Sequence, residues 1–304
     1  MPASPAFDLG GRVALVTGSS RGIGRSLADG LAAAGATVVL NGLDKSRLDR
    51  TRAELAERHG SDRVHASPFD MTDEHQVTAA VAGVEGDVGP IDVLVNNAGI
   101  QHRVPMLDLD VADWRRVVEH NLTSAFIVGR AVARRMVERH RGKIIDIGSV
   151  QSDLARPPIA PYTASKGGLR NLTRAMAAEW GGANIQANSV APGYIHTEMT
   201  QNLVDDAAFN AWVVGRTPAG RWGSSADLVG PTVWLASAAS DYVNGQTIFV
   251  DGGMTAVISA EFLAAGIPDR AVGLVAHAAR DVRVECPVLT FDPALAPSRA
   301  GPPR

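Results

Sequence analysis

Cysteine is nearly absent from this 304-residue chain, which holds only Cys286. An intrachain disulfide is therefore excluded, and no group of cysteines and histidines has the spacing of a zinc site. An excess of basic charge is also missing: 29 lysines and arginines stand against 32 acidic residues, a formal net charge of −3. Domains that bind nucleic acids are usually basic, so the sequence predicts no nucleic-acid partner.

Long apolar runs are missing as well. No window holds 18 uninterrupted apolar residues, so no transmembrane helix is expected. Residues 1–7 lack the basic region and apolar run of a secretory signal. With 45% hydrophobic and 20% charged residues, the composition is that of an ordinary globular protein. We therefore expect a cytoplasmic protein without membrane contact and without a metal site.

Short apolar strands alternate with helical segments along the chain. Strands are expected at residues 12–17, 37–40, 62–69, 91–95, 143–147, 185–190 and 247–250. Helices are expected at residues 22–34, 45–58, 72–84, 111–140 with a break near Asn121, 161–180 and 226–237. This alternation predicts an α/β fold: a single doubly wound, Rossmann-like parallel sheet with helices on both faces. Ligands bind such sheets beyond the carboxyl ends of the strands, where the strand order reverses.

The alternation ends after residues 251–253. From about residue 259 an Ala-rich stretch is followed by a Pro-rich end. We therefore expect one Rossmann-like domain over residues 1–258. Residues 259–304 would be a C-terminal extension, partly disordered, to which the sequence assigns no role.

A glycine-rich segment, TGSSRGIG at residues 17–24, follows the first strand and opens a helix. Glycines let the backbone turn tightly and approach a pyrophosphate, and the helix N-terminus supplies N–H donors. The pattern alone is also compatible with a turn that binds nothing.

Asn96, Asn97, Ala98 and Gly99 come at the end of the fourth expected strand. Their small side chains would allow a ribose or nicotinamide to approach. The asparagines could instead tie neighbouring strands together, and both functions are compatible.

Ser149 follows the fifth expected strand, and Tyr162 and Lys166 share one face of the next helix because they are four residues apart. A free tyrosine has a pKa near 10 and is a poor base. A lysine ammonium and a cationic nicotinamide would stabilise the phenolate, which would make Tyr162 a proton-transfer group. An ordinary surface pair is the alternative.

Taken in order, these motifs resemble the short-chain dehydrogenase/reductase family over residues 8–255. The resemblance rests on the glycine-rich segment, on residues 96–99, on Asn121 and Ser149, on the Tyr162/Lys166 pair and on Pro192-Gly193. It implies that Asn121, Ser149, Tyr162 and Lys166 are catalytic. It also implies cofactor contacts from Gly18, Ser20, Arg21, Gly22, Ile23, Gly24, Asn41, Asp70, Asn97, Ala98, Gly99, Tyr162, Lys166, Pro192, Gly193, Ile195 and Thr197.

Within that family, residues 97–103, 149–152, 192–199 and 209–223 resemble the gluconate 5-dehydrogenases. This resemblance implies hydride transfer between a nicotinamide cofactor and C5 of gluconate or 5-ketogluconate. Arg103 would bind the carboxylate, and Ser149, Gln151 and Tyr162 would contact the substrate. Reduction of a 3-oxoacyl group or of another keto-sugar is the alternative chemistry. A cofactor-binding regulator without catalysis is the alternative class.

The cofactor is expected to be NADP, with NAD as the alternative. Gly42 stands where NAD-dependent enzymes place an acidic residue against the ribose hydroxyls, and Arg21 offers a cation for a 2′-phosphate. Leu43 departs from the arginine that gluconate 5-dehydrogenases often carry. Asp44 is expected to cap the next helix rather than oppose a phosphate. The family resemblance further implies a homotetramer.

Overall fold

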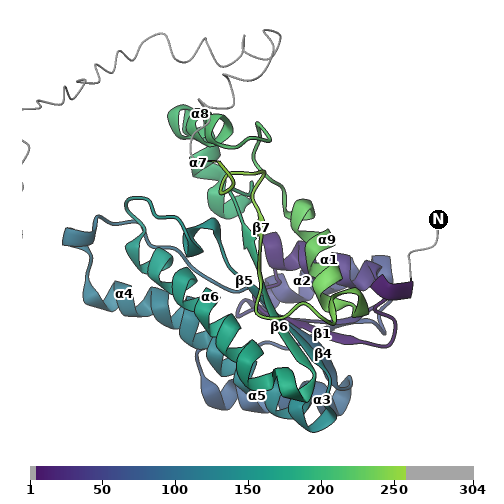
Figure 1. The fold of residues 1–304 in the computed structure, drawn as a ribbon. Coiled ribbons are helices and arrows are strands. Elements are labelled where there is room, and N and C mark those ends of the chain that lie inside the picture. Colours follow the sequence, from purple (N-terminus) through teal and green to yellow (C-terminus); the bar gives the residue numbers. More distant parts are fainter. Residues whose placement is uncertain (1–4, 258–304) are drawn as a thin grey trace, which may run out of the picture. The chain divides into compact units, whose positions relative to one another are not determined.

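The computed structural model describes residues 5–257, and they form one seven-stranded parallel sheet (Figure 1). The strand order is β3-β2-β1-β4-β5-β6-β7, so the order reverses between β1 and β4. The strands are β1 Val13–Val16, β2 Thr37–Leu40, β3 Val64–Ala66, β4 Ile91–Asn96, β5 Gly142–Ile147, β6 Ile185–Pro192 and β7 Thr247–Val250. The predicted doubly wound sheet is confirmed. The predicted extension over residues 259–304 lies outside the described residues.

Helices cover both faces of the sheet, as expected. The helices are α1 Gly22–Ala33, α2 Lys45–His59, α3 Glu74–Asp87, α4 Val111–Val118, α5 Ser124–Arg139, α6 Ala160–Trp180, α7 Gln201–Asp205, α8 Ala207–Arg216 and α9 Val229–Ala236. One core lies under α1, α2 and α9, and a second lies under α3, α5 and α6. Neighbouring residues of β1 alternate between the two cores: Ala14 and Val16 face the first, Val13 and Leu15 the second.

The third strand is shorter than the predicted 62–69. Asn41 Nδ2 donates to the carbonyls of Ser67 and Phe69, at 3.2 and 3.0 Å. These carbonyls are therefore turned toward the end of β2 and β3 ends at Ala66. The next helix begins at Glu74 rather than Thr72, because the Asp73 carboxylate accepts from the N–H groups of His75 and Gln76 and makes Asp73 the N-cap.

The long helical region expected at residues 111–140 is divided, as predicted, near Asn121. A π-helical turn, Glu119–Thr123, separates α4 from α5. The last expected helix, 226–237, starts as the 3₁₀ turn Ser225–Leu228 before α9. Further 3₁₀ turns are Pro5–Phe7, Met106–Asp108, Val150–Ser152, Gly181–Ala183, Glu198–Thr200 and Ala238–Ser240.

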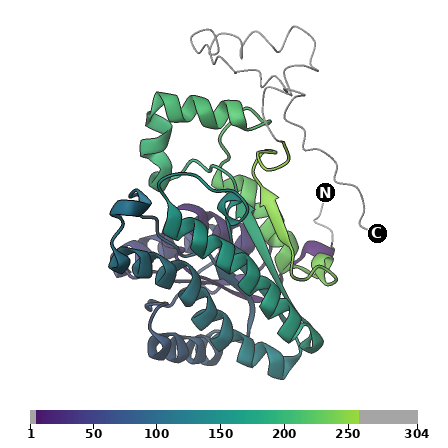
Figure 2. The same ribbon diagram turned by 60° about the vertical axis from the view of Figure 1, so that its left-hand side comes forward.

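The sequence analysis missed α7 and α8. These two short helices follow β6 and stand beyond one end of the sheet, away from α3 and α5 (Figures 1 and 2). The Asp206 carboxylate accepts from the N–H groups of Ala208 and Phe209 and so begins α8. Within residues 5–257, no helix is long and apolar enough to cross a bilayer.

Close packing of α1 on α9 yields a test of the fold. A Cβ added to Gly30 in α1 would overlap the Val229 side chain, whereas one added to Gly83 in α3 meets nothing within 4 Å. We expect Gly30→Ala to lower the free energy of unfolding by about 1–3 kcal/mol, because a well-packed core resists extra volume. The matched control, Gly83→Ala, should raise it by about 0.5–1 kcal/mol, since alanine favours a helix. Denaturant unfolding measures both. Equal effects of the two substitutions would contradict the packing argument.

Candidate active site

A cleft of about 370 Å³ runs along the carboxyl ends of the central strands. It is therefore at the place where the sequence predicts a ligand. Of the predicted site residues, the cleft is lined by Gly18, Ser20, Arg21, Gly22, Ile23, Gly24, Asn41, Asn97, Ala98, Gly99, Arg103, Ser149, Gln151, Tyr162, Lys166, Pro192, Gly193, Ile195 and Thr197. Asn121 and Asp70 do not line it.

The glycine-rich loop between β1 and α1 fits a pyrophosphate. A Cβ on Gly18 would lie 2.9 Å from Ala98 Cα, and one on Gly24 would overlap the Asn97 amide. Gly22 has φ +57° and nothing within 4 Å of an added Cβ, so its backbone faces open space. No side chain caps the N-terminus of α1. Its first N–H groups and the positive end of the helix dipole are therefore available to an anion.

Asn97 joins the loops that follow β1 and β4. Its Nδ2 donates to the carbonyls of Thr17 and Gly18, at 2.9 and 3.1 Å. Thr17 Oγ1 in turn accepts from the N–H groups of Asn97 and Ala98. The preceding Asn96 donates to Asp146 Oδ1 on β5 at 2.9 Å. These asparagines thus tie neighbouring strands together, which is one of the two functions considered for them. Their contact with a ribose stays a prediction.

At the end of β2, Asp44 caps α2 as predicted: its Oδ1 accepts from Arg47 N at 3.0 Å. Its carboxylate is therefore engaged by the helix. Asn41 lines the cleft, but its side chain is engaged with the backbone of Gly18, Ser67 and Phe69. Leu43 is exposed beside them.

Arg21 does not stand alone at this end of the cleft. Its Nη1 lies 3.3 Å from Glu198 Oε2, and both side chains are more than half exposed. An exposed ion pair of this kind contributes at most about 1 kcal/mol, so it can be exchanged for a stronger anion.

Asp70 was predicted to contact the cofactor, but the structure does not bring it into the cleft. Its Oδ1 accepts from the N–H and the hydroxyl of Thr72, at 2.9 and 2.7 Å. The carboxylate thus shapes the turn that leads into α3.

Asn121 lies behind the cleft wall, within the π-helical turn, and is 1% exposed. Its Oδ1 accepts from Ile100 N at 2.8 Å, and its Nδ2 donates to Ile100 O and Ser165 Oγ. Asn121 therefore fixes the loop after β4 against α6, and a role in moving protons stays a prediction.

Ser149 and Gln101 lie beside the Tyr162 hydroxyl at the floor of the cleft. Hydrogen bonds with both side chains, and the charges of Arg103 and Arg156, lower the Tyr162 pKa, but burial outweighs them and raises it. Lys166 is not among the groups that lower this pKa in the structure, and its stabilisation of the phenolate together with a cationic nicotinamide stays a prediction. The Lys166 ammonium lies 5.7 Å from the centre of the Tyr162 ring and donates instead to Ile147 O at 2.6 Å.

Lys166 is 4% exposed, and burial lowers its pKa to about 8. The carboxylate that opposes this shift is Asp146, a fully buried residue of β5 that the sequence analysis did not single out. Asn96 and Thr173 hydrogen-bond its two oxygens, at 2.9 and 2.7 Å. Burial raises the Asp146 pKa in spite of these contacts.

The substrate end of the cleft holds more polar groups than the sequence indicated. Arg103 and Gln151 were predicted there, and Arg156 and Tyr194 line the same space. Two nearby histidines, His102 and His196, do not line the cleft and have partners of their own. His102 Nε2 lies 3.2 Å from Asp113 Oδ2, and His196 Nε2 lies 2.8 Å from Gln201 Oε1.

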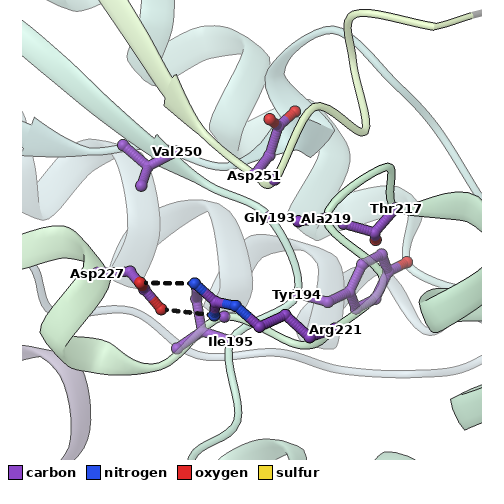
Figure 3. Close-up of a pocket in the computed structure, with 11 residues that line it drawn as sticks. Gly193, Tyr194, Ile195, Thr217, Ala219, Arg221, Asp227, Val250 and Asp251 are labelled. Atoms are coloured by element: carbon purple, nitrogen blue, oxygen red, sulfur yellow. Dashed lines mark hydrogen bonds and ion pairs between the residues drawn. The ribbon is translucent and has the colours of Figure 1, made fainter.

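A second, smaller cavity of about 220 Å³ lies along the segment that follows β6 (Figure 3). Its charges are already satisfied. Arg221 is paired with Asp227 at 3.0 Å, and the Asp251 carboxylate accepts from Gly253 N, Thr255 N and the Thr255 hydroxyl. The larger cleft is therefore the better candidate for a charged ligand.

Comparisons with known proteins agree with this geometry. A family model described as enoyl-(acyl carrier protein) reductase matches residues 18–255. The chain is 53% identical over 249 residues to a gluconate 5-dehydrogenase of Gluconobacter oxydans (strain 621H), covering 82% of this chain and 96% of the relative. It is 49% identical over 252 residues to a 5-keto-D-gluconate 5-reductase of Escherichia coli (strain K12), covering 83% and 98%.

Among solved structures, the chain is similar to a gluconate 5-dehydrogenase from Burkholderia cenocepacia J2315 in complex with NADP and tartrate. The identity is 50% and the TM-score 0.81, over 83% of this chain and 98% of that chain. The predicted similarity to this group of enzymes is thereby confirmed.

The buried lysine predicts a dependence of stability on pH. Lys166 has a pKa of about 8 in the folded protein against 10.5 for an ordinary lysine. Below pH 8 Lys166 is protonated in both the folded and the unfolded protein, so the buried charge lowers the free energy of unfolding by its full amount. Between pH 8 and 10.5 the unfolded state binds more protons, so stability rises with pH. Relative to Lys166→Met, the wild type should gain about 2–3 kcal/mol in free energy of unfolding from pH 7 to pH 10.

Urea unfolding at equal protein concentration measures this difference at the two pH values. Lys45→Met, which replaces an exposed lysine, is the matched control. A difference between wild type and Lys166→Met that stays constant with pH would contradict the prediction.

Proposed function

This chain belongs to the short-chain dehydrogenase/reductase family, and on that premise we propose that it interconverts gluconate and 5-ketogluconate with NADP(H). It is an NAD(P)-dependent oxidoreductase acting on CH–OH groups. The observation that carries the proposal is the meeting of Ser149, Tyr162 and Lys166 at the floor of one cleft that also holds the glycine-rich loop. The similar enzymes, about half identical to this chain, are named for gluconate and 5-ketogluconate.

The cleft has the features that a dinucleotide phosphate requires. The glycine-rich loop and the N-terminus of α1 would hold the pyrophosphate, and Asn97, Ala98, Gly99 and Lys166 would hold the nicotinamide ribose. When bound, the cofactor supplies or accepts a hydride at C4 of its nicotinamide. Arg21 and Ser20 would bind the 2′-phosphate. No carboxylate opposes a phosphate there, because Gly42 has no side chain and the Asp44 carboxylate caps α2.

Proton transfer falls to Tyr162. In the reducing direction, its hydroxyl donates a proton to the ketone oxygen at C5. Burial favours this, because it keeps the phenol protonated. Ser149 Oγ accepts from Gln151 N at 3.1 Å, which leaves its own hydrogen free for the substrate oxygen. Lys166, held by Ile147 O, stabilises the phenolate that remains, and Asn121 would hold a water that leads the replacing proton in from solvent.

The other end of the substrate would lie among the polar groups beyond Tyr162. Arg103 supplies a cation for the carboxylate, and Gln151 supplies hydrogen bonds to hydroxyls. A 3-oxoacyl chain would leave the guanidinium and amide groups of this lining without partners, although Met199 and Leu203 also line the cleft.

The homotetramer and the cytoplasmic location stay predictions. Among the apolar residues of α5 and α6, Phe126 is 42% exposed, while Ile127, Val128, Val132, Leu169 and Met176 are buried. Apolar exposure continues at Val111, Trp114 and Val137 on α4 and α5, so these helices offer a face for a second subunit.

Removal of the Tyr162 hydroxyl tests the proposed reduction of 5-ketogluconate. We expect wild-type protein to reduce 5-ketogluconate with NADPH, and Tyr162→Phe to lower kcat by about 10²- to 10⁴-fold, the usual contribution of acid–base catalysis. The KM for NADPH should change little. Tyr242→Phe removes the same atom from a fully exposed tyrosine and is the matched control. Retention of more than about a tenth of the activity in Tyr162→Phe would remove Tyr162 from the mechanism.

A second substitution tests the cofactor. The wild type should have a higher kcat/KM with NADP than with NAD. Arg21→Ala should reduce the ratio of the two by about 10- to 100-fold, the contribution of one charge-assisted hydrogen bond. Glu198→Gln frees Arg21 from its ion pair and should raise the ratio or leave it unchanged. A wild-type preference for NAD is the contrary outcome and would indicate Asn41 and Asp44 as ribose ligands.

A further inference from the structure

Two guanidinium groups line the substrate end of the cleft without a carboxylate partner. Arg103 comes from the loop after β4, and Arg156 comes from the segment between the 3₁₀ turn Val150–Ser152 and α6. Among the described residues, no acidic side chain forms an ion pair with either. Other arginines at the two cavities are neutralised, Arg21 by Glu198 and Arg221 by Asp227 (Figure 3).

Holding two like charges near each other costs free energy. Burial and the neighbouring Arg156 both lower the pKa of the Arg103 guanidinium, which is the expected sign for a cation that lacks a counter-ion. Both charges also act on Tyr162. An anion between the two guanidiniums would remove the repulsion, so the site is electrostatically complete only with a negatively charged ligand.

Arg156 is fixed in place rather than free on the surface. Its guanidinium lies 5.2 Å from the centre of the Phe209 ring, and its Nη1 donates to Pro157 O at 2.9 Å. Phe209 is itself held in an aromatic cluster, with Tyr194 at 5.6 Å and Trp212 at 5.4 Å between ring centres. A guanidinium stacked on an aromatic ring keeps its orientation and its remaining N–H donors.

Buried polar atoms without partners complete the same end of the cleft. Gln151 is 7% exposed, and its Oε1 has no hydrogen-bond partner among the described residues. The hydroxyl of Tyr194 is likewise buried, and the guanidinium of Arg156 is its neighbour. A buried polar atom without a partner is unfavourable, so these groups are expected to bind the hydroxyls of a ligand.

We propose that Arg156 and Arg103 together bind the carboxylate of a polyhydroxy acid, and that Arg156 is a specificity-determining residue for acids over uncharged ketoses. This inference rests on the proposed function. A carboxylate has two oxygens with about four acceptor positions, enough for hydrogen bonds from both guanidiniums. An uncharged ketose of the same length leaves both cations unpaired and is therefore disfavoured.

Two substrates that differ only at the carboxylate test the proposal. L-sorbose carries a hydroxymethyl group where 5-ketogluconate carries the carboxylate. We expect Arg156→Gln to raise the KM for 5-ketogluconate by about 10- to 100-fold, the loss of one charge-assisted hydrogen bond, and to change kcat by less than about 3-fold. The kcat/KM for L-sorbose should stay within about 3-fold of wild type, so the selectivity for the acid falls.

Three further variants test separately the guanidinium shape of Arg156, its support by Phe209, and the net charge of the protein. Arg156→Lys keeps the charge but loses the planar fork and should have an intermediate KM. Phe209→Leu removes the ring under Arg156 and should raise the KM for the acid by about 2- to 5-fold, with no matching change for L-sorbose. Arg50→Gln removes an exposed arginine of α2 outside the cleft and should leave both substrates unchanged.

Calorimetric titration of tartrate into the NADP-loaded full chain distinguishes failure of this proposal from failure of the proposed function. If wild type reduces 5-ketogluconate and Arg156→Gln has an unchanged KM, the role of Arg156 is overturned and the function stands. If wild type does not reduce it but binds tartrate at least tenfold more tightly than Arg156→Gln does, the proposed function fails and the anion site stands. If tartrate binding is absent or independent of Arg156, and 5-ketogluconate is not reduced, both fail.

Discussion

The hydrogen bonds between Asn97 and the start of the glycine-rich loop hold together the two loops that diverge where the strand order reverses. A parallel sheet brings the carboxyl ends of its strands to one edge, and the reversal between β1 and β4 opens that edge. Gly18 and Gly24 allow Asn97 and Ala98 to approach closely, and no side chain caps the N-terminus of α1. The part of the cleft that would hold the pyrophosphate borders this junction.

A second constraint is the burial of ionisable groups behind the reacting centre. Lys166 is 4% exposed and donates to the Ile147 carbonyl, and the charge of Asp146 acts on it. The two oxygens of Asp146 are hydrogen-bonded by Asn96 and Thr173. A charge at such depth is costly unless other groups compensate for it. The protein compensates within three elements, β4, β5 and α6, so the geometry of the lysine is tied to the packing of the sheet. The stability of the fold and the charge state of Lys166 therefore depend on the same few side chains.

The sequence predicted the elements that local patterns define. Apolar runs placed the strands, Asp44 marked the start of α2, and the spacing of Tyr162 and Lys166 placed both on one face of α6. What it missed depends on contacts between segments far apart in the chain. The sequence analysis singled out neither Asp146, a single polar residue within a strand, nor Arg156, whose guanidinium lies over Phe209 of α8. Asp70 is a different case, because the residue that engages its carboxylate, Thr72, is only two positions further along the chain.

On the proposal above, the contact of Arg156 with Phe209 of α8 separates substrate selection from the chemical step, although both use one cleft. Ser149 comes from the turn after β5 and Tyr162 from α6, whereas Phe209, the aromatic support of Arg156, belongs to α8, which follows β6. On the proposed role of Arg156, substitutions in α8 would alter which substrates are accepted and would leave the chemical step intact. The architecture thus leaves one region free to diversify under selection, and an engineer who seeks a new substrate should randomise residues of α7 and α8 before any residue of the sheet.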